Sequence, residues 1–256
     1  DVAVTGVQTC ALPILYEDIH PHIEIDKTIN DYLTTLGIKK DYFDCKKILD
    51  CGFGGTAWAV ELFCQSNAAE VHGIDLNPNW KISVAERLKN HPVQPKLITG
   101  NVLELPYQNN YFDYVHSHGV MHHTTDWKKG IEEMVRVCKP GGTIYLMLYG
   151  KFAPVGKFIH FSYRNLGKII PYSWSKAFVT ATGIFQNHEV SLLDAMYAPI
   201  EVHLSQKEIT EHLQALSMED ILFFESAKWK QKKFFSSDLM FGSNIQNVVL
   251  AKKGNN

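Results

Sequence analysis

The chain contains 256 residues, 45% of them hydrophobic, with a formal net charge of −2 at pH 7, which suffices for one large domain with a complete core. The balanced charge gives no basic field for a nucleic-acid partner, and no apolar run approaches the roughly 20 residues that cross a bilayer, which argues against a membrane partner. The five cysteines show no CxxC spacing, so we expect reduced thiols in a cytoplasmic protein with small-molecule partners and an oligomeric state left open.

Residues 1–14 do not read as native sequence. The stretch VTGVQTCALPI, Val4 to Ile14, matches letter by letter the translation of a widely used sequencing-adapter oligonucleotide. The segment also lacks the basic region that begins a signal peptide. We therefore interpret residues 1–14 as adapter-derived and expect one native domain over residues 15–256, with its true start unknown.

Strands and helices alternate through the first part of the chain. A leading helix is expected over 25–36, where apolar residues recur at helical spacing and Gly37 follows as a stop. Apolar strands are expected at 46–51, 71–75, 95–101, 111–117 and 143–149, with helices at 56–65, 77–89 and 126–138. Asn77, with Pro78 after it, and Asp126 are expected helix N-caps. Such alternation is typical of a parallel sheet with helices on both faces.

The pattern changes after Tyr149. Residues 150–204 are aromatic, helix-prone and interrupted by prolines. A helix at 205–216 follows, and two strands at 220–224 and 244–253 suit an antiparallel edge pair. We predict an α/β fold with an open, doubly wound, mainly parallel seven-stranded sheet, and a helical insertion after the fifth strand that lies over the carboxyl edge of the sheet.

The ends of the first two strands have features of a ligand site. The first strand ends in DCGFGG, Asp50 to Gly55, where Gly52 and Gly54 allow a tight turn and a close approach to a ligand. Asp75 ends the second strand 23 residues after Gly52, where a carboxylate can accept hydrogen bonds from both hydroxyls of a ribose. Each feature alone could be structural, a turn or a loop cap. Together they favour an adenosine ligand, although the GxGxxG pattern of a dinucleotide site is incomplete.

Four segments form a family pattern when they are read in order. They are ILDCGFGG, VHGIDLNP, TGNVLELPYQNNYFDYVHSHGVMHHTTDW and VCKPGGTIYLMLYG. In this order the chain resembles the class I S-adenosylmethionine-dependent methyltransferases, nearly throughout Lys47 to Lys253. The resemblance implies a Rossmann-like methyltransferase fold with S-adenosyl-L-methionine as the cofactor. The cofactor-binding residues that it implies are Asp50, Gly52, Gly54, Gly55, Asp75, Leu76, Asn101, Val102 and His116.

Three positions depart from that family pattern. Phe53 stands where a small residue is common, and Thr56 stands where many members have a third glycine, so we expect altered packing under the methionine part of the cofactor. Asn101 replaces the aspartate that accepts a hydrogen bond from the adenine amino group. Its amide oxygen can still accept, but without charge assistance, so a lower cofactor affinity is expected.

Histidines gather at the end of the fourth predicted strand: His116, His118, His122 and His123. Histidine binds transition metals readily, but the nearest carboxylate, Asp126, suits a helix cap, so we expect no bound metal. Methyl transfer is a one-step displacement in which positioning supplies most of the catalysis. A base is needed only for a protonated acceptor. The candidates are His118, His122, His123 and Tyr149, each of which could instead only pack locally.

The acceptor is expected to be a small organic molecule. The stretch HSHGV lacks the motifs that amino-methylating and cytosine-C5 enzymes of nucleic acids carry, and the clustered acids of metal-dependent catechol enzymes are absent. We therefore expect metal-independent transfer to an O or N atom. The insertion mixes aromatic residues with polar ones such as His160 and Glu201, as acceptor pockets do. Its end, LLDAMYAPIEV, resembles a stretch of small-molecule methyltransferases, and the expected acceptor contacts are His188, Asp194 and Tyr197.

Two other functions stay open. A non-catalytic partner subunit that binds S-adenosylmethionine would keep Asp75 and the glycines but have a blocked acceptor pocket. A nicotinamide-dependent oxidoreductase would place its phosphates on the Gly52 turn. Titration with the two cofactors distinguishes these classes.

Overall fold

The computed structural model describes residues 25–182, 193, 196–224 and 246–255. The strands are β1 (Lys47–Cys51), β2 (Glu70–Asp75), β3 (Lys96–Thr99), β4 (Phe112–His118), β5 (Cys138–Tyr149), β6 (Met218–Phe224) and β7 (Gln246–Lys253). The α-helices are α2 (Ile25–Leu36), α3 (Trp58–Gln65), α4 (Pro78–Leu88), α5 (Trp127–Val137), α6 (Pro154–Gly167), α7 (Tyr172–Thr182) and α9 (Gln206–Ala215). Two short 3-10 helices are η2 (Lys40–Phe43) and η3 (Met121–His123).

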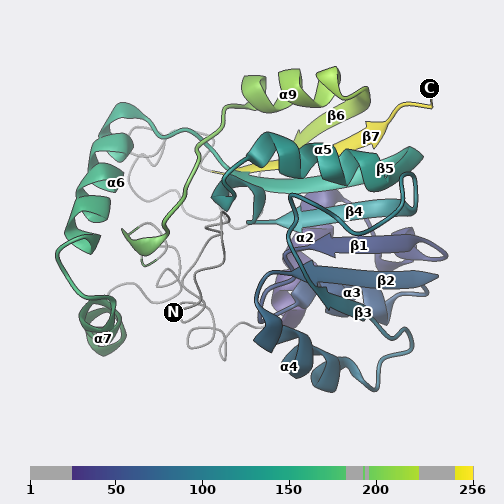
Figure 1. The fold of residues 1–256 in the computed structure, drawn as a ribbon, viewed down its shortest axis with the longest axis horizontal. Coiled ribbons are helices and arrows are strands. Elements are labelled where there is room, and N and C mark those ends of the chain that lie inside the picture. Colours follow the sequence, from purple (N-terminus) through teal and green to yellow (C-terminus); the bar gives the residue numbers. More distant parts are fainter. Residues whose placement is uncertain (1–24, 183–192, 194–195, 225–245, 256) are drawn as a thin grey trace.

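The strands form one open seven-stranded sheet in the order β3-β2-β1-β4-β5-β7-β6 (Figure 1). Strands β1 to β5 pair in parallel, and β7 runs antiparallel to both β5 and β6. The predicted fold class and the antiparallel edge pair are confirmed. The strand order reverses between β1 and β4, which makes the carboxyl ends of these strands the expected ligand edge.

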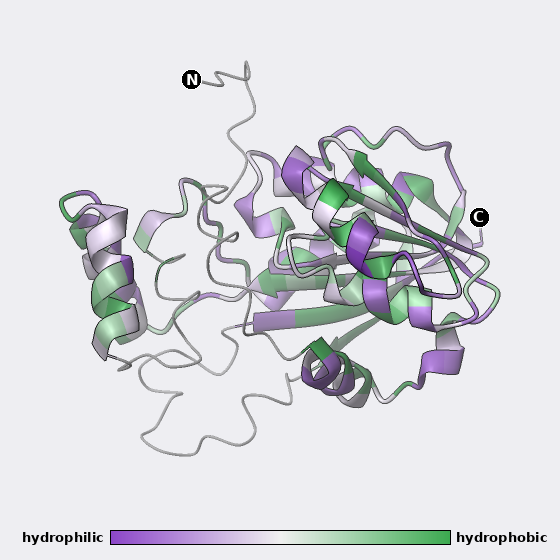
Figure 2. Cartoon of the chain, turned by 90° about the horizontal axis from the view of Figure 1, so that it is seen from below, coloured by the Kyte–Doolittle hydropathy of each residue, from purple (hydrophilic) through white to green (hydrophobic). Residues whose placement is uncertain are grey.

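Helices pack on both faces of the sheet, so its central strands are buried on two sides. In β1, Ile48 belongs to the core under α2, α3 and α4, whereas Leu49 belongs to the core under α5 and α9. Successive side chains of a strand point to opposite faces, which explains why the neighbouring residues Ile48 and Leu49 are both apolar. Figure 2 shows the central strands as largely hydrophobic.

The local signals of the sequence act as expected at the helix starts. Asn77 accepts a hydrogen bond from the backbone N–H of Asn79 at the start of α4, and Asp126 accepts one from Lys129 at the start of α5. Both predicted N-caps are therefore confirmed.

Strand β5 differs from its prediction, because it begins at Cys138 rather than at residue 143. Cys138 already pairs with Phe112 before the register shifts, so the KPGG stretch belongs to an irregular strand.

Helices α6 and α7 follow β5 and lie beyond the carboxyl ends of the parallel strands (Figure 1). The chain then returns along the sheet edge, where Leu204 forms a parallel bridge with Gly150. The predicted insertion therefore contains helices, and its boundaries as a unit stay a prediction. Among the described helices, none has the length and apolar character needed to cross a membrane.

Candidate functional site

The glycine turn after β1 requires glycine at its first position. Gly52 has φ +83° and Gly54 has φ +60°, both in the region that favours glycine. A Cβ atom on Gly52 would lie 2.4 Å from Cγ2 of Val120, which follows β4. The turn is thus packed directly against the loop that follows β4.

Asp75 links the ends of β2 and β1. One carboxylate oxygen accepts a hydrogen bond from the backbone N–H of Gly54 at 2.9 Å, and the other accepts from Asn77 at 2.9 Å. The side chain is buried, and burial raises the pKa of Asp75 to about 6, although the N–H groups of Asn77 and Gly54 oppose this shift. A carboxylate has about four lone-pair positions, so Asp75 can still accept from a ligand hydroxyl group.

Asp50 and His116 form a buried pair beneath this turn. The Nδ1 atom of His116 lies 2.7 Å from Oδ1 of Asp50, and the two residues are 1% and 2% exposed. The ring of His116 stacks on Tyr145 at 4.6 Å between centroids. Within the described part of the chain, Nε2 of His116 is buried and has no hydrogen-bond partner. The structure therefore joins these two predicted cofactor residues to each other, with one polar atom left over for a ligand or a water.

The remaining predicted cofactor residues lie near the glycine turn. Leu76 follows β2, and Asn101 and Val102 follow β3. Leu76 is 42% exposed directly after Asp75, and Val102 is 6% exposed. The side-chain oxygen of Asn101 accepts a hydrogen bond from the backbone N–H of Leu103 at 3.0 Å. Asn101 therefore caps its own turn, and its amide oxygen keeps one lone pair. Gly55 packs against the indole of Trp80, where an added Cβ would lie 3.2 Å from Nε1.

The predicted base candidates fall into two environments. His118 ends β4. Its Nδ1 atom lies 2.9 Å from the hydroxyl of Tyr145, and the side chain is only half-buried. His122 and Tyr149 stack with their ring centroids 3.8 Å apart, and His123 packs against His122 at 4.2 Å. The structure thus brings His122, His123 and Tyr149 into one aromatic cluster and leaves His118 more accessible.

His122 is completely buried, and neither ring nitrogen has a hydrogen-bond partner within the described residues. Burial, followed by the neighbouring His123, lowers the pKa of His122 well below its ordinary value. The ring is therefore neutral at pH 7 and is a weak proton acceptor. His123 faces the carbonyl oxygen of Ile200 through Nδ1 at 2.8 Å, which ties it to the returning segment. His118 is the most accessible of the three histidines, which favours it as the base candidate.

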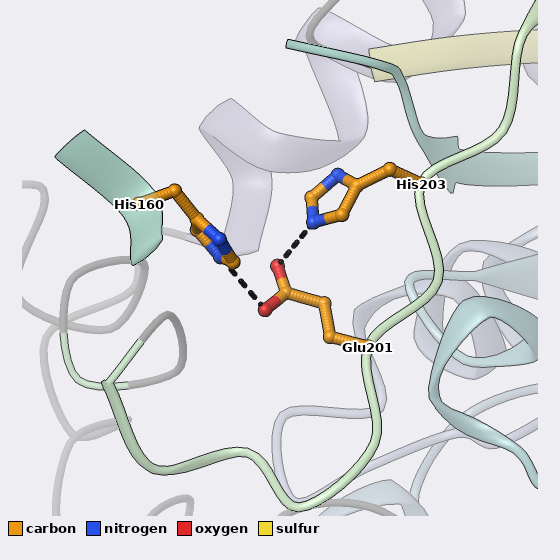
Figure 3. Close-up of side chains that lie close together, drawn as sticks. All are labelled: His160, Glu201 and His203. Carbon is orange, nitrogen blue, oxygen red and sulfur yellow. Dashed lines mark hydrogen bonds and ion pairs between the residues drawn. The ribbon is translucent and has the colours of Figure 1, made fainter. Parts of the chain in front are cut away.

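A polar cluster beside this edge combines residues that the sequence analysis did not join. His160 on α6 lies 2.9 Å from Oε2 of Glu201 through Nε2, and His203 lies 3.2 Å from Oε1 through Nε2 (Figure 3). Burial would raise the pKa of Glu201, but hydrogen bonds with His160 and His203 hold it at about 2. The sequence analysis noted His160 and Glu201 only as polar residues of the insertion. His203 was missed, since an isolated histidine before a helix gives no signal.

Of the predicted acceptor contacts, Tyr197 lies within the described residues, whereas His188 and Asp194 lie outside them. The Tyr197 hydroxyl donates to the carbonyl oxygen of Ile170 at 2.8 Å and lies 2.7 Å from Oγ of Ser175. Its ring also packs edge-on against Tyr172 at 5.4 Å. Tyr197 therefore attaches the returning segment to α7, and an acceptor contact would have to involve its ring.

Comparison with known proteins places this geometry in a family. A family described as a methyltransferase domain matches residues 49–146, from β1 into β5. The demethylmenaquinone methyltransferase of Bacillus pumilus is 30% identical over 174 residues, which cover 60% of this chain and 73% of that protein. The protein of the same name from Bacillus licheniformis is 36% identical over 95 residues, which cover 37% of this chain and 40% of that protein. The chain spans about half the length of several other relatives of that name.

The fold is similar to that of a solved methyltransferase. A solved S-adenosylmethionine-dependent methyltransferase from Mesorhizobium loti superposes with a TM-score of 0.58 at 13% identity, covering 90% of this chain and 100% of that one. At this identity the likeness concerns the fold alone. The match to most of the Bacillus pumilus protein, together with the methyltransferase-domain match, shows that the chain belongs to the S-adenosylmethionine-dependent methyltransferases.

Proposed function

We propose that the chain transfers the methyl group of S-adenosylmethionine to a small organic acceptor. The observation that supports this most directly is the hydrogen bond between the Gly54 N–H and the Asp75 carboxylate, at the point where the strand order of the sheet reverses. It holds the Asp75 carboxylate beside a turn in which Gly52 and Gly54 have no side chains to cover the backbone. A ribose with two hydroxyl groups fits this arrangement.

The residues that would hold the cofactor lie around that carboxylate. Asp75 would accept from the ribose hydroxyls, and exposed Leu76 would cover one face of the adenine. Asn101 would accept from the adenine amino group through its remaining lone pair, and Nε2 of buried His116 would serve the methionine end, directly or through a water. Bound there, S-adenosylmethionine supplies an electrophilic methyl group on a positively charged sulfur.

The chain's own part in the reaction is to position the acceptor and exclude water. Tyr149, which is partly exposed and stacks on buried, uncharged His122, would offer an aromatic surface to the acceptor at the end of β5. His118 would accept a proton from an acceptor that carries one. The expectation that transfer needs no metal stays a prediction, as do the acceptor contacts His188, Asp194 and Tyr197.

The names of the relatives favour a menaquinone precursor as the acceptor class, and demethylmenaquinone is the first compound to test. The sequence predicted an O or N atom as the methylated atom, and whether a menaquinone precursor is methylated at such an atom is a separate question. Product analysis by mass spectrometry after transfer of a labelled methyl group identifies both the acceptor and the methylated atom.

The deciding experiment combines calorimetry with label transfer on the full chain. Saturable S-adenosylmethionine binding that Asp75→Ala weakens by about 2 kcal/mol or more, with methyl transfer to an acceptor, supports the proposal. Cofactor binding without turnover on any acceptor pool would indicate a non-catalytic partner subunit. Binding of a nicotinamide cofactor instead of S-adenosylmethionine would indicate an oxidoreductase and refute the proposal.

A further inference from the structure

The cluster of His160, Glu201 and His203 has the spacing of a metal-ligand set. One possible ligand atom from each residue lies within 4.8 Å of the other two (Figure 3). The two histidine nitrogens lie 2.9 Å and 3.2 Å from the carboxylate oxygens that they face. Ligands of a tetrahedral zinc ion, each 2.0–2.1 Å from the metal, are about 3.3 Å apart. An ion could therefore enter with small side-chain movements.

Each of two cluster residues, His203 and Glu201, makes a further hydrogen bond outside the cluster. Such bonds commonly orient the side chains that bind a metal. Nδ1 of His203 lies 3.0 Å from the carbonyl oxygen of Gly150, which can only accept, so Nδ1 carries a proton. Nε2 of a neutral His203 then presents a lone pair toward Glu201. Arg164 donates to Oε2 of Glu201 at 3.1 Å and to the carbonyl oxygen of Ala198 at 2.9 Å, which fixes the carboxylate.

Arg164 already pairs with Oε2 of Glu201, but within the described residues the facing atoms of His203 and Glu201 have no positive charge between them. A lone pair on Nε2 of His203 and a carboxylate oxygen of Glu201, 3.2 Å apart, repel each other unless a proton or a metal ion lies between them. Glu201 is only 4% exposed, so water screens this repulsion poorly, whereas His160 and His203 are 14% and 19% exposed and leave an entry path.

We propose that His160, Glu201 and His203 bind a divalent transition-metal ion, with zinc as the best match to two imidazoles and one carboxylate. Three protein ligands leave one position of a tetrahedral ion for a water or an oxygen atom of a bound molecule. His203 stacks on Tyr149 at 6.0 Å, so the ion would lie beside the end of β5. This site lies outside the histidines at 116–123, where a metal was considered from the sequence and none was expected.

Metal binding to the full chain, without a polyhistidine tag and stripped of metal, tests the proposal. Zinc calorimetry should give one saturable site per chain, and cobalt should give the visible absorption of a four-coordinate ion. His203→Gln and Glu201→Gln should each weaken binding at least about tenfold, whereas His91→Gln, a histidine after α4, should not.

Either of two results overturns the metal site. Absence of saturable zinc binding by the unaltered chain would mean that the cluster is an ion-pair network with protonated histidines, and this result does not depend on whether the variants fold. Equal zinc affinity of the unaltered chain and His203→Gln, with unchanged circular dichroism, would place the ion elsewhere. Both readouts are independent of methyl transfer.

A different observation concerns the outer surface of α6 and α7, which lie apart from the sheet at the left of Figure 2. Large apolar side chains on these helices and on the connection between them are exposed: Phe158 (71%), Phe161 (64%), Ile169 (81%), Trp174 (73%) and Phe178 (57%). A set of this size marks a surface that contacts another apolar phase. Residues 151–182 contain five lysines and arginines and no aspartate or glutamate. Apolar residues combined with basic charge are typical of helices that lie in an anionic lipid interface.

We infer that the outer surface of α6 and α7 binds anionic membrane surfaces, contrary to the expectation from overall charge. Full-length chain should cosediment with phosphatidylglycerol-containing vesicles, weakly with pure phosphatidylcholine, and less as salt increases. Phe158→Ser with Trp174→Ser should reduce binding at least about tenfold, and Lys157→Glu with Lys168→Glu should reduce it similarly. Ile82→Ser, which alters a 76% exposed residue on α4, is the matched control.

Failure of the unaltered chain to bind anionic vesicles overturns this inference. An equal loss of binding in Ile82→Ser would show a nonspecific effect of exposed apolar residues and would overturn it as well. Self-association in sedimentation velocity that Phe158→Ser abolishes, without vesicle binding, would identify the surface as an interface between two copies of the chain.

Discussion

Replacing Asp75 by asparagine should stabilise the free chain while it weakens cofactor binding. The pKa of Asp75 is raised from its ordinary 3.8 to about 6, chiefly by burial. The folded chain therefore favours the protonated form, and its stability falls as pH rises from about 4 to about 6. This difference between the folded and unfolded pKa values lowers the free energy of unfolding of the cofactor-free chain by about 3 kcal/mol at pH 7.

The Asp75→Asn variant removes that charge but has only one acceptor oxygen for the N–H groups of Gly54 and Asn77. Losing one of these hydrogen bonds costs about 1–2 kcal/mol. The net expectation is a chain about 1–2 kcal/mol more stable at pH 7, which raises Tm by about 2–4 °C for each kcal/mol. A neutral acceptor serves the ribose hydroxyls less well, so cofactor affinity should fall about 10- to 30-fold.

Calorimetry from pH 5 to pH 8 and thermal unfolding measure both effects. In the unaltered chain, S-adenosylmethionine affinity should be constant above about pH 7 and fall about tenfold for each pH unit below 6, because binding needs the ionised carboxylate. Asp75→Asn should remove this dependence. A variant that melts lower than the unaltered chain at pH 7 and binds the cofactor equally well would refute both the burial cost and the ribose assignment.

Further substitutions test the glycine turn, the Tyr197 hydroxyl and the Asn101 side chain. Gly52→Ala should destabilise the chain by about 2–3 kcal/mol, since its φ of +83° and the methyl of Val120 both oppose a Cβ, and adding Val120→Ala should restore part of the loss in denaturant unfolding. Tyr197→Phe should cost about 1–2 kcal/mol of stability with unchanged cofactor affinity; an unchanged Tm would contradict the role of its hydroxyl. Asn101→Asp should tighten S-adenosylmethionine binding severalfold by calorimetry, and a clear loss would place this side chain away from adenine.

Signals confined to neighbouring residues allowed much of the fold to be predicted. Asn77 and Asp126 cap helices because their short side chains reach N–H groups two or three residues ahead, a contact that does not depend on the rest of the chain. The apolar run in β1 and the glycines after it indicate a buried parallel strand and a tight turn for the same reason. The spacing of Asp75 from Gly52 then suggested a ligand edge. The structure shows a hydrogen bond between Asp75 and Gly54 at that edge, and the ligand itself stays a prediction.

Only the tertiary structure decided which polar residues meet. Asp50 pairs with His116 across 66 residues, and His160 pairs with Glu201 across 41, because separate elements place them side by side. Burial likewise made His122 neutral and left His118 accessible, although the two occur in the same sequence motif. The sequence determines the period and the ends of each element through local sterics and hydrogen bonding. The pairing and charge state of distant side chains depend on how those elements pack and exclude water, which no local pattern encodes.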